Sequence, residues 1–236
     1  MLIDDLFSRL STAVSPHGTF AILAQDYDSK PKGNGIEING PAITAKSGGA
    51  FRGGSAAVSA TGPIAINSGA LKGTSGITMA VAEGITTSDT FTVNGGIVEA
   101  RGGGSSKFDD GPEIAISSGI SADKGIAING GEVTAQGATD RGDADYVLAF
   151  YTKEGSVDIA DNLDVTVSKS ADGSDPIEWD RSTPLHNEKS PYQYAKVTSS
   201  GQTPPGLPSA VPSTAPANPG TPTSTAPATS ATPEPE

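Results

Sequence analysis

Cysteine is absent from this chain of 236 residues, and aromatic residues make up only 5% of it. Without cysteine the protein has no disulfide bond, no thiolate metal site and no thiol nucleophile. With so few rings it must fill its interior mainly with Ile, Val and Ala. We therefore expect a narrow core rather than a thick one.

Basic residues are also scarce, because 15 Lys and Arg stand against 27 Asp and Glu, for a formal net charge of −12. Nucleic acids and anionic membrane surfaces require a basic face, so we expect neither as a partner. The sequence has no run of about twenty apolar residues, and we expect no membrane insertion.

The two ends of the chain differ from its middle. Apolar residues at helical spacing predict a short amphipathic helix over residues 2–14, and with the strand that follows it we expect residues 1–24 to form an N-terminal cap. Residues 201–236 hold more than half of the 18 prolines and no aromatic residue. Because nothing there can be buried, we expect a disordered Pro/Thr/Ala-rich tether.

An internal repeat occupies the middle of the chain. Its best copy runs from Ile126 to Ala135 and consists of two short alternating strands joined by an Asn-Gly corner. Further copies begin at Ile36, Ile64 and Phe91, and a degraded copy begins at Ile114.

Two all-β folds satisfy this repeat. Asn-Gly between alternating strands is typical of a hairpin, so a β-sandwich of hairpins is the alternative. A single-stranded parallel β-helix, or solenoid, is favoured by small residues at the end of the second strand, which suit a narrow coil: Ala45, Ala100, Ala122 and Ala135. It is also favoured by corner asparagines that can stack in a hydrogen-bonded ladder, namely Asn39, Asn67, Asn94 and Asn129. We predict solenoid repeats over residues 25–145, then final coils and a C-terminal cap over residues 146–200.

The pattern Ile-x-Ile-Asn-Gly-Gly-x-Val-x-Ala at Ile126 to Ala135 resembles the repeats of bacterial surface solenoids of the carbohydrate-binding and adhesin-like type. The segments Trp179 to Leu185 and Ser190 to Val197 are similar to the closing part of such domains. The resemblance covers roughly residues 35–197. It implies a parallel β-helix, export to the cell surface or medium, and polysaccharide or another surface component as partner. Met1 to Asp5 carry acids where a secretory signal carries Lys or Arg, so export is an inference.

Candidate binding residues follow from ligand chemistry. Sugar faces pack on aromatic rings, and five rings cluster late in the chain: Tyr146, Tyr151, Trp179, Tyr192 and Tyr194. Calcium prefers several hard oxygens from one loop, which Asp140, Asp143 and Asp145 could supply. We expect no other cofactor.

Three functions remain open. We favour a non-catalytic, extracellular module that binds polysaccharide or mediates adhesion. The second hypothesis is a purely structural stalk. The third is a β-helix polysaccharide lyase or glycosidase, which requires Asp109 or Asp110 in a groove near Lys107 or Arg101.

Overall fold

The computed structural model describes residues 19–24, 35–50, 53–107, 114–140 and 142–199. The chain divides into two units, Met1–Gln202 and Thr203–Glu236, and all described residues belong to the first. The helix expected over residues 2–14 and the tether expected over residues 201–236 lie outside the described residues. The described chain is all-β and forms two sheets, one parallel and one mixed.

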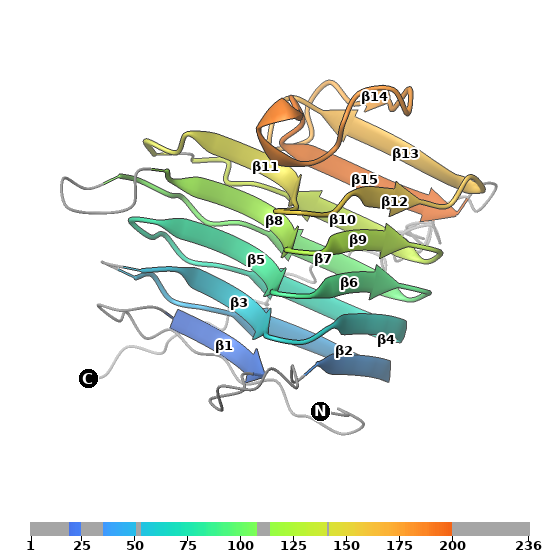
Figure 1. Cartoon of the computed structure of the whole chain (residues 1–236), viewed down its shortest axis with the longest axis horizontal. Helices are drawn as coiled ribbons and strands as arrows, with labels where there is room; N and C mark the ends of the chain where they lie inside the picture. The colour runs from blue at the N-terminus through green and yellow to red at the C-terminus, as the bar shows by residue number, and fades with distance from the viewer. Residues whose placement is uncertain (1–18, 25–34, 51–52, 108–113, 141, 200–236) are drawn as a thin grey trace, which may run out of the picture. The chain divides into compact units, whose positions relative to one another are not determined.

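The first sheet has five strands, and every neighbouring pair in it is parallel. Along the sheet they are β1 (Thr19–Ala24), β3 (Ser55–Ala60), β5 (Val81–Thr87), β8 (Ile116–Ala122) and β11 (Tyr146–Tyr151). Each strand therefore lies beside the strand from the next pass of the chain, as Figure 1 shows. Because β1 pairs with β3, the strand that we placed in the N-terminal cap belongs to this sheet.

The second sheet has ten strands. They are β2 (Ile36–Lys46), β4 (Ile64–Thr74), β6 (Thr90–Val93), β7 (Ile97–Arg101), β9 (Gly125–Ile128), β10 (Glu132–Gln136), β12 (Val157–Ile159), β13 (Leu163–Ser168), β14 (Ile177–Glu178) and β15 (Tyr194–Ser199). The first half of β4 pairs in parallel with β6 and its second half with β7. β9 and β10 continue these two rows in parallel.

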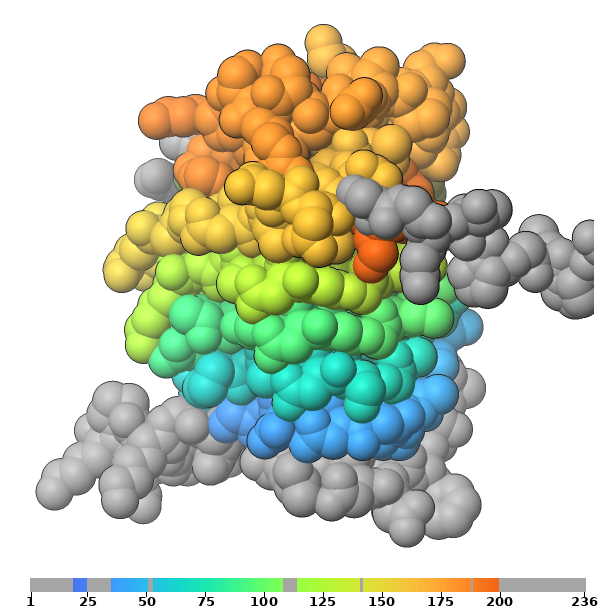
Figure 2. Space-filling view, turned by 90° about the vertical axis from the view of Figure 1, so that its right-hand side faces the viewer, coloured from blue at the N-terminus to red at the C-terminus, as the bar shows by residue number. Residues whose placement is uncertain are grey.

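The Asn-Gly corners do not close hairpins. β6 and β7 flank Asn94 and Gly95, yet each pairs with strands from other passes and not with the other. The hairpin reading of the repeat is therefore wrong at this corner. Successive passes of the chain therefore stack in layers that follow the sequence order, as Figure 2 shows.

The corner asparagines are joined along the stack. Asn67 Nδ2 donates to Asn39 Oδ1 over 2.8 Å, Asn94 Nδ2 donates to Asn67 Oδ1 over 2.8 Å, and Asn129 Nδ2 donates to Asn94 Oδ1 over 2.9 Å. These are the hydrogen bonds that the recurrence of asparagine predicts. The partners lie 28, 27 and 35 residues apart in the sequence. The irregular spacing of the repeat is thus absorbed by loops, while the stacking stays in register.

The core is narrow, as the composition predicts. Ile36, Ile64, Phe91 and Ile126 form one buried row of register partners. A second row contains Ala45, Gly73, Ala100 and Ala135. A Cβ at Gly73 would lie 2.7 Å from the carbonyl oxygen of Gly84 on the facing sheet, so only the smallest side chains fit in this row.

The degraded copy at Ile114 is placed wrongly by the sequence argument. Ile116 and Ala122 lie in β8, which pairs with β5 and β11 in the first sheet. Ala122 is therefore buried beside Thr87, and it is not a member of the alanine row.

The C-terminal end closes with antiparallel pairing. β15 runs antiparallel to both β10 and β13 and lies between them. Beyond β13, the Arg181 guanidinium donates to the carbonyl oxygens of Leu163 over 3.1 Å and of Ile159 over 3.2 Å. Arg181 also lies over the Trp179 ring, 5.6 Å from its centroid. The two hydrogen bonds satisfy backbone acceptors near the end of the stack.

Glu83 is a partly buried acid in β5, opposite Ser118 of β8. Burial raises the pKa of its carboxyl, and the nearby charge of Asp123 acts in the same direction. The hydroxyls of Ser121 and Thr86 hydrogen-bond the carboxyl and lower its pKa in part. The ionised form is thus disfavoured in the folded protein relative to the unfolded chain.

Replacing Asn94 by alanine removes one hydrogen bond that its side chain donates and one that it accepts. We expect the free energy of unfolding to fall by about 1–2 kcal/mol, because a typical hydrogen bond contributes roughly 0.5–1.5 kcal/mol net. Urea denaturation measures the change. The matched control is Asn162→Ala, since Asn162 is exposed and its side chain has no hydrogen-bond partner among the described residues. An equal fall in the free energy of unfolding of the two variants would show that the asparagine hydrogen bonds do not stabilise the fold.

Replacing Glu83 by glutamine changes how stability depends on pH. A carboxyl with a raised folded pKa contributes stability that is complete below its unfolded pKa and is lost as pH rises through the folded pKa. E83Q lacks this loss, so the variant gains stability relative to the parent as pH rises from acid to neutral. Unfolding free energies of both proteins at several pH values test this. A difference that stays constant with pH would show that Glu83 is not a source of the dependence.

Candidate functional site

Two rows of outward-facing side chains cross the second sheet. The strand-end row consists of register partners at the last residue of each parallel strand: Lys46, Thr74, Arg101 and Gln136. Tyr194 of β15 continues this row beyond Gln136. The middle row lies two residues earlier on each parallel strand and two residues later on the antiparallel β15, and it contains Thr44, Lys72, Glu99, Thr134 and Lys196.

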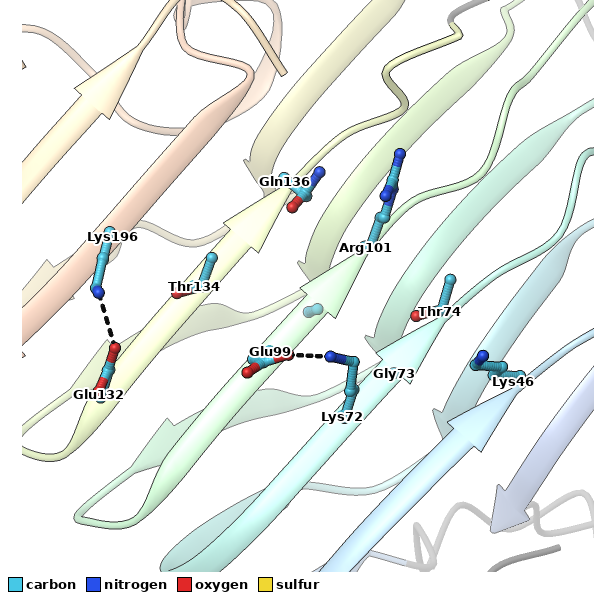
Figure 3. A pocket seen from close by; sticks show the side chains of 11 residues that line it. Lys46, Lys72, Gly73, Thr74, Glu99, Arg101, Glu132, Thr134, Gln136 and Lys196 are labelled. Carbon is cyan, nitrogen blue, oxygen red and sulfur yellow. Dashed lines mark hydrogen bonds and ion pairs between the residues drawn. The ribbon is translucent and has the colours of Figure 1, made fainter. Parts of the chain in front are cut away.

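Most residues of these rows line a groove with a volume of about 460 Å³, whereas Thr44 and Tyr194 do not belong to its lining. The groove spans β2, β4, β7, β10 and β15, and its walls include the strand-end row from Lys46 to Gln136 together with Lys72, Glu99, Thr134, Glu132 and Lys196 of the same face. Figure 3 shows their side chains arranged along neighbouring strands. They reach this face because the strands alternate, with Val98, Ala100, Val133 and Ala135 buried on the other side.

Both acids of the groove have a lysine partner. Lys72 forms an ion pair with Glu99 on the neighbouring strand, and Lys196 Nζ lies 2.9 Å from Glu132 Oε1. The hydrogen bond to Glu132 is the main cause of a raised pKa at Lys196. Within the middle of the groove, positive and negative charge therefore cancel.

The cations of the strand-end row lack such partners. Lys46 is exposed and has no acidic partner among the described residues. Arg101 donates from Nη2 to Thr139 Oγ1 over 2.5 Å and likewise has no acidic partner in the described part of the chain. One edge of the groove thus carries two positive charges that no carboxylate of the described residues neutralises.

The five predicted rings do not form one platform. Tyr146 and Tyr151 lie at opposite ends of β11 in the first sheet, whereas Tyr194 lies in β15 of the second. Tyr192 is 6% exposed and belongs to the core, which removes it as a sugar-stacking surface. Trp179 packs against the same core, and its indole N–H donates to the Thr183 carbonyl oxygen over 2.8 Å. Tyr194 is the one ring of the five in register with the strand-end row, beside Gln136, but it is not part of the groove lining.

The three aspartates predicted to bind calcium are not brought together. Asp145 pairs with Lys107 over 2.7 Å and accepts a hydrogen bond from the Ala115 amide over 2.8 Å. These two contacts lower the pKa of its carboxyl, the lysine first. Asp140 and Asp143 are exposed. Among the described residues no group of three or more His, Asp or Glu side chains could hold a metal ion.

The catalytic hypothesis rests on residues that the structure separates in part. Asp109 and Asp110 lie outside the described residues. Lys107 is paired with Asp145, away from the groove lining, whereas Arg101 lines the groove. The acids that line the groove are Glu99 and Glu132, which the sequence argument did not single out.

A signal for the groove was present in the repeat. In the Val-x-Ala-x part of each copy, the two variable positions point outward, and in the copy at Val98 they are Glu99 and Arg101. Because copies stack in register, these positions form continuous rows. The search for rings and acid clusters passed over them.

The chain matches no protein-family model, no curated protein and no solved structure. Within the described residues, no helix has the length and apolar character needed to span a bilayer.

Proposed function

We propose that the chain is a single-stranded parallel β-helix, exported to the cell surface or medium, that binds an extended polysaccharide without cleaving it. The parallel pairing of strands from successive passes supports the fold. The resemblance of the Ile-x-Ile-Asn-Gly-Gly-x-Val-x-Ala repeat to bacterial surface solenoids supports the location and the ligand class.

One observation carries the binding proposal. The groove of about 460 Å³ runs across five neighbouring strands and is lined by side chains that both donate and accept hydrogen bonds. Neighbouring strands lie about 4.8 Å apart, which is close to the length of one sugar unit. A polysaccharide laid along the stack would therefore meet one polar residue of the strand-end row at each unit.

The polar character of the groove agrees with such a ligand. Sugar hydroxyls require hydrogen-bonding partners, and Thr74, Thr134 and Gln136 supply them between the charged residues. The partly buried ring of Tyr194 ends the row, where one sugar face can pack against its accessible part.

The test is binding of soluble cello-, xylo-, chito-, hyaluronan and polygalacturonate oligosaccharides to the full chain, measured by isothermal titration calorimetry. The double variant Thr74→Val/Thr134→Val removes two hydroxyls with little change in shape. We expect its affinity for the bound glycan to fall about tenfold or more, because each lost hydrogen bond contributes roughly 0.5–1.5 kcal/mol.

The matched control is Thr92→Val/Thr183→Val, which changes two partly exposed threonines outside both rows and outside the groove lining. It should bind as the parent does. Equal losses in both variants would place the binding surface elsewhere. Failure of every glycan to bind would favour the structural stalk, and release of shortened sugars during incubation would favour the lyase or glycosidase.

A further inference from the structure

The charge arrangement of the groove points to a particular class of glycan. We propose that the ligand carries an acidic group on alternate sugar units, and that Lys46 and Arg101 each bind one of these groups. This inference rests on the proposed function, since it names the ligand of the same groove.

The sign of the ligand follows from the balance of charges. The whole chain has a formal net charge of −12, yet the groove contains four cations and two acids: Lys46, Lys72, Arg101, Lys196, Glu99 and Glu132. Two of the lysines are paired with the two acids. Lys46 and Arg101 remain, so the edge of the groove attracts an anion on an otherwise acidic molecule.

The spacing of the ligand's charges follows from the strand register. Lys46 is the register partner of Thr74, and Thr74 is the partner of Arg101. The two cations are therefore two strands apart, or roughly 9.6 Å, because neighbouring strands lie about 4.8 Å apart. That distance corresponds to two sugar units, with the neutral Thr74 facing the unit between them.

A glycan with an acidic group on every sugar unit fits the charges of the groove less well. An acid on every unit, with all the acids facing the groove, would place one carboxylate at Thr74 and another at Gln136, neither of which is a cation. These carboxylates would also approach Glu99 and Glu132, whose charges their lysines offset only in part. Like charges in close proximity are unfavourable, so the groove discriminates against such a polymer.

The two cations differ in the contact that each can make. A guanidinium binds a carboxylate through two parallel hydrogen bonds, whereas an ammonium acts as a point charge. The hydroxyl of Thr139 accepts a hydrogen bond from Nη2 of Arg101 and orients the guanidinium beside the groove. Arg101 is thus the more selective contact and Lys46 the less directional one.

The experiment compares three oligosaccharides of equal length on the full chain by calorimetry, at about 0.15 M salt. Hyaluronan carries an acid on alternate units, polygalacturonate carries one on every unit, and fully N-acetylated chito-oligosaccharide is neutral. We expect hyaluronan to bind at least about tenfold more tightly than either of the others. Its affinity should also fall as salt rises, because ion pairs are screened.

The variant Lys46→Gln/Arg101→Gln should lose this preference, with hyaluronan affinity reduced by about tenfold or more. Lys153→Gln/Lys169→Gln changes the net charge by the same amount at exposed lysines outside the groove and should keep the preference. Circular dichroism checks that both variants are folded.

The outcomes separate this inference from the proposed function. If the neutral or fully charged oligosaccharide binds as tightly as hyaluronan, and Thr74→Val/Thr134→Val weakens that binding, the groove binds glycans but the alternate-charge inference is wrong. The inference is also wrong if Lys46→Gln/Arg101→Gln and Lys153→Gln/Lys169→Gln reduce hyaluronan affinity equally. If none of the three binds while a cello- or xylo-oligosaccharide does, the alternate-charge inference alone is wrong. If none of the five glycans binds, the proposed function fails with it.

Discussion

Parallel hydrogen bonding between successive passes of the chain is the constraint on which every other feature depends. It places Ile36, Ile64, Phe91 and Ile126 in one row and so joins separate stretches of sequence into one core. The same register brings each corner asparagine within hydrogen-bond distance of the next. On the outer face it aligns Lys46, Thr74, Arg101 and Gln136, which are far apart in the sequence. A shift of one residue would turn these side chains toward the core.

The two faces of the second sheet carry different residues because successive side chains of a strand point to opposite faces. Inward positions hold small apolar residues because the facing sheet is close, as the 2.7 Å approach at Gly73 shows. Outward positions carry no such limit, so their chemistry can vary from copy to copy. That freedom lets Lys72 and Glu99 cancel in the middle of the groove while Lys46 and Arg101 remain uncompensated at its edge. Stability and recognition therefore depend on different residues of the same strands.

The sequence predicted the all-β class, the narrow core and the asparagine stack, because these features repeat and local chemistry accounts for them. It did not predict the sheet to which Ile116 belongs. The segment Ile114-Ala115-Ile116 resembles the repeat, yet Ile116 pairs with Val81 and Tyr146 of the first sheet. The sequence argument also grouped Tyr146, Tyr192 and Trp179 as candidate sugar-binding rings, whereas Tyr192 is buried in the core and Trp179 packs against that core. The groove arises from residues on five strands, so the outward positions of the Val-x-Ala-x segment indicate it only once the copies are known to stack in register.

The most direct test of this account is to map the glycan-contacting face on the isotopically labelled full chain by NMR. Backbone amide shifts would be followed during titration with a hyaluronan oligosaccharide. The account predicts that the largest changes fall on Lys46, Thr74, Arg101 and Gln136, which are register partners on one face. Changes confined to β11 around Tyr146 and Tyr151, or spread over both sheets without relation to the rows, would contradict it.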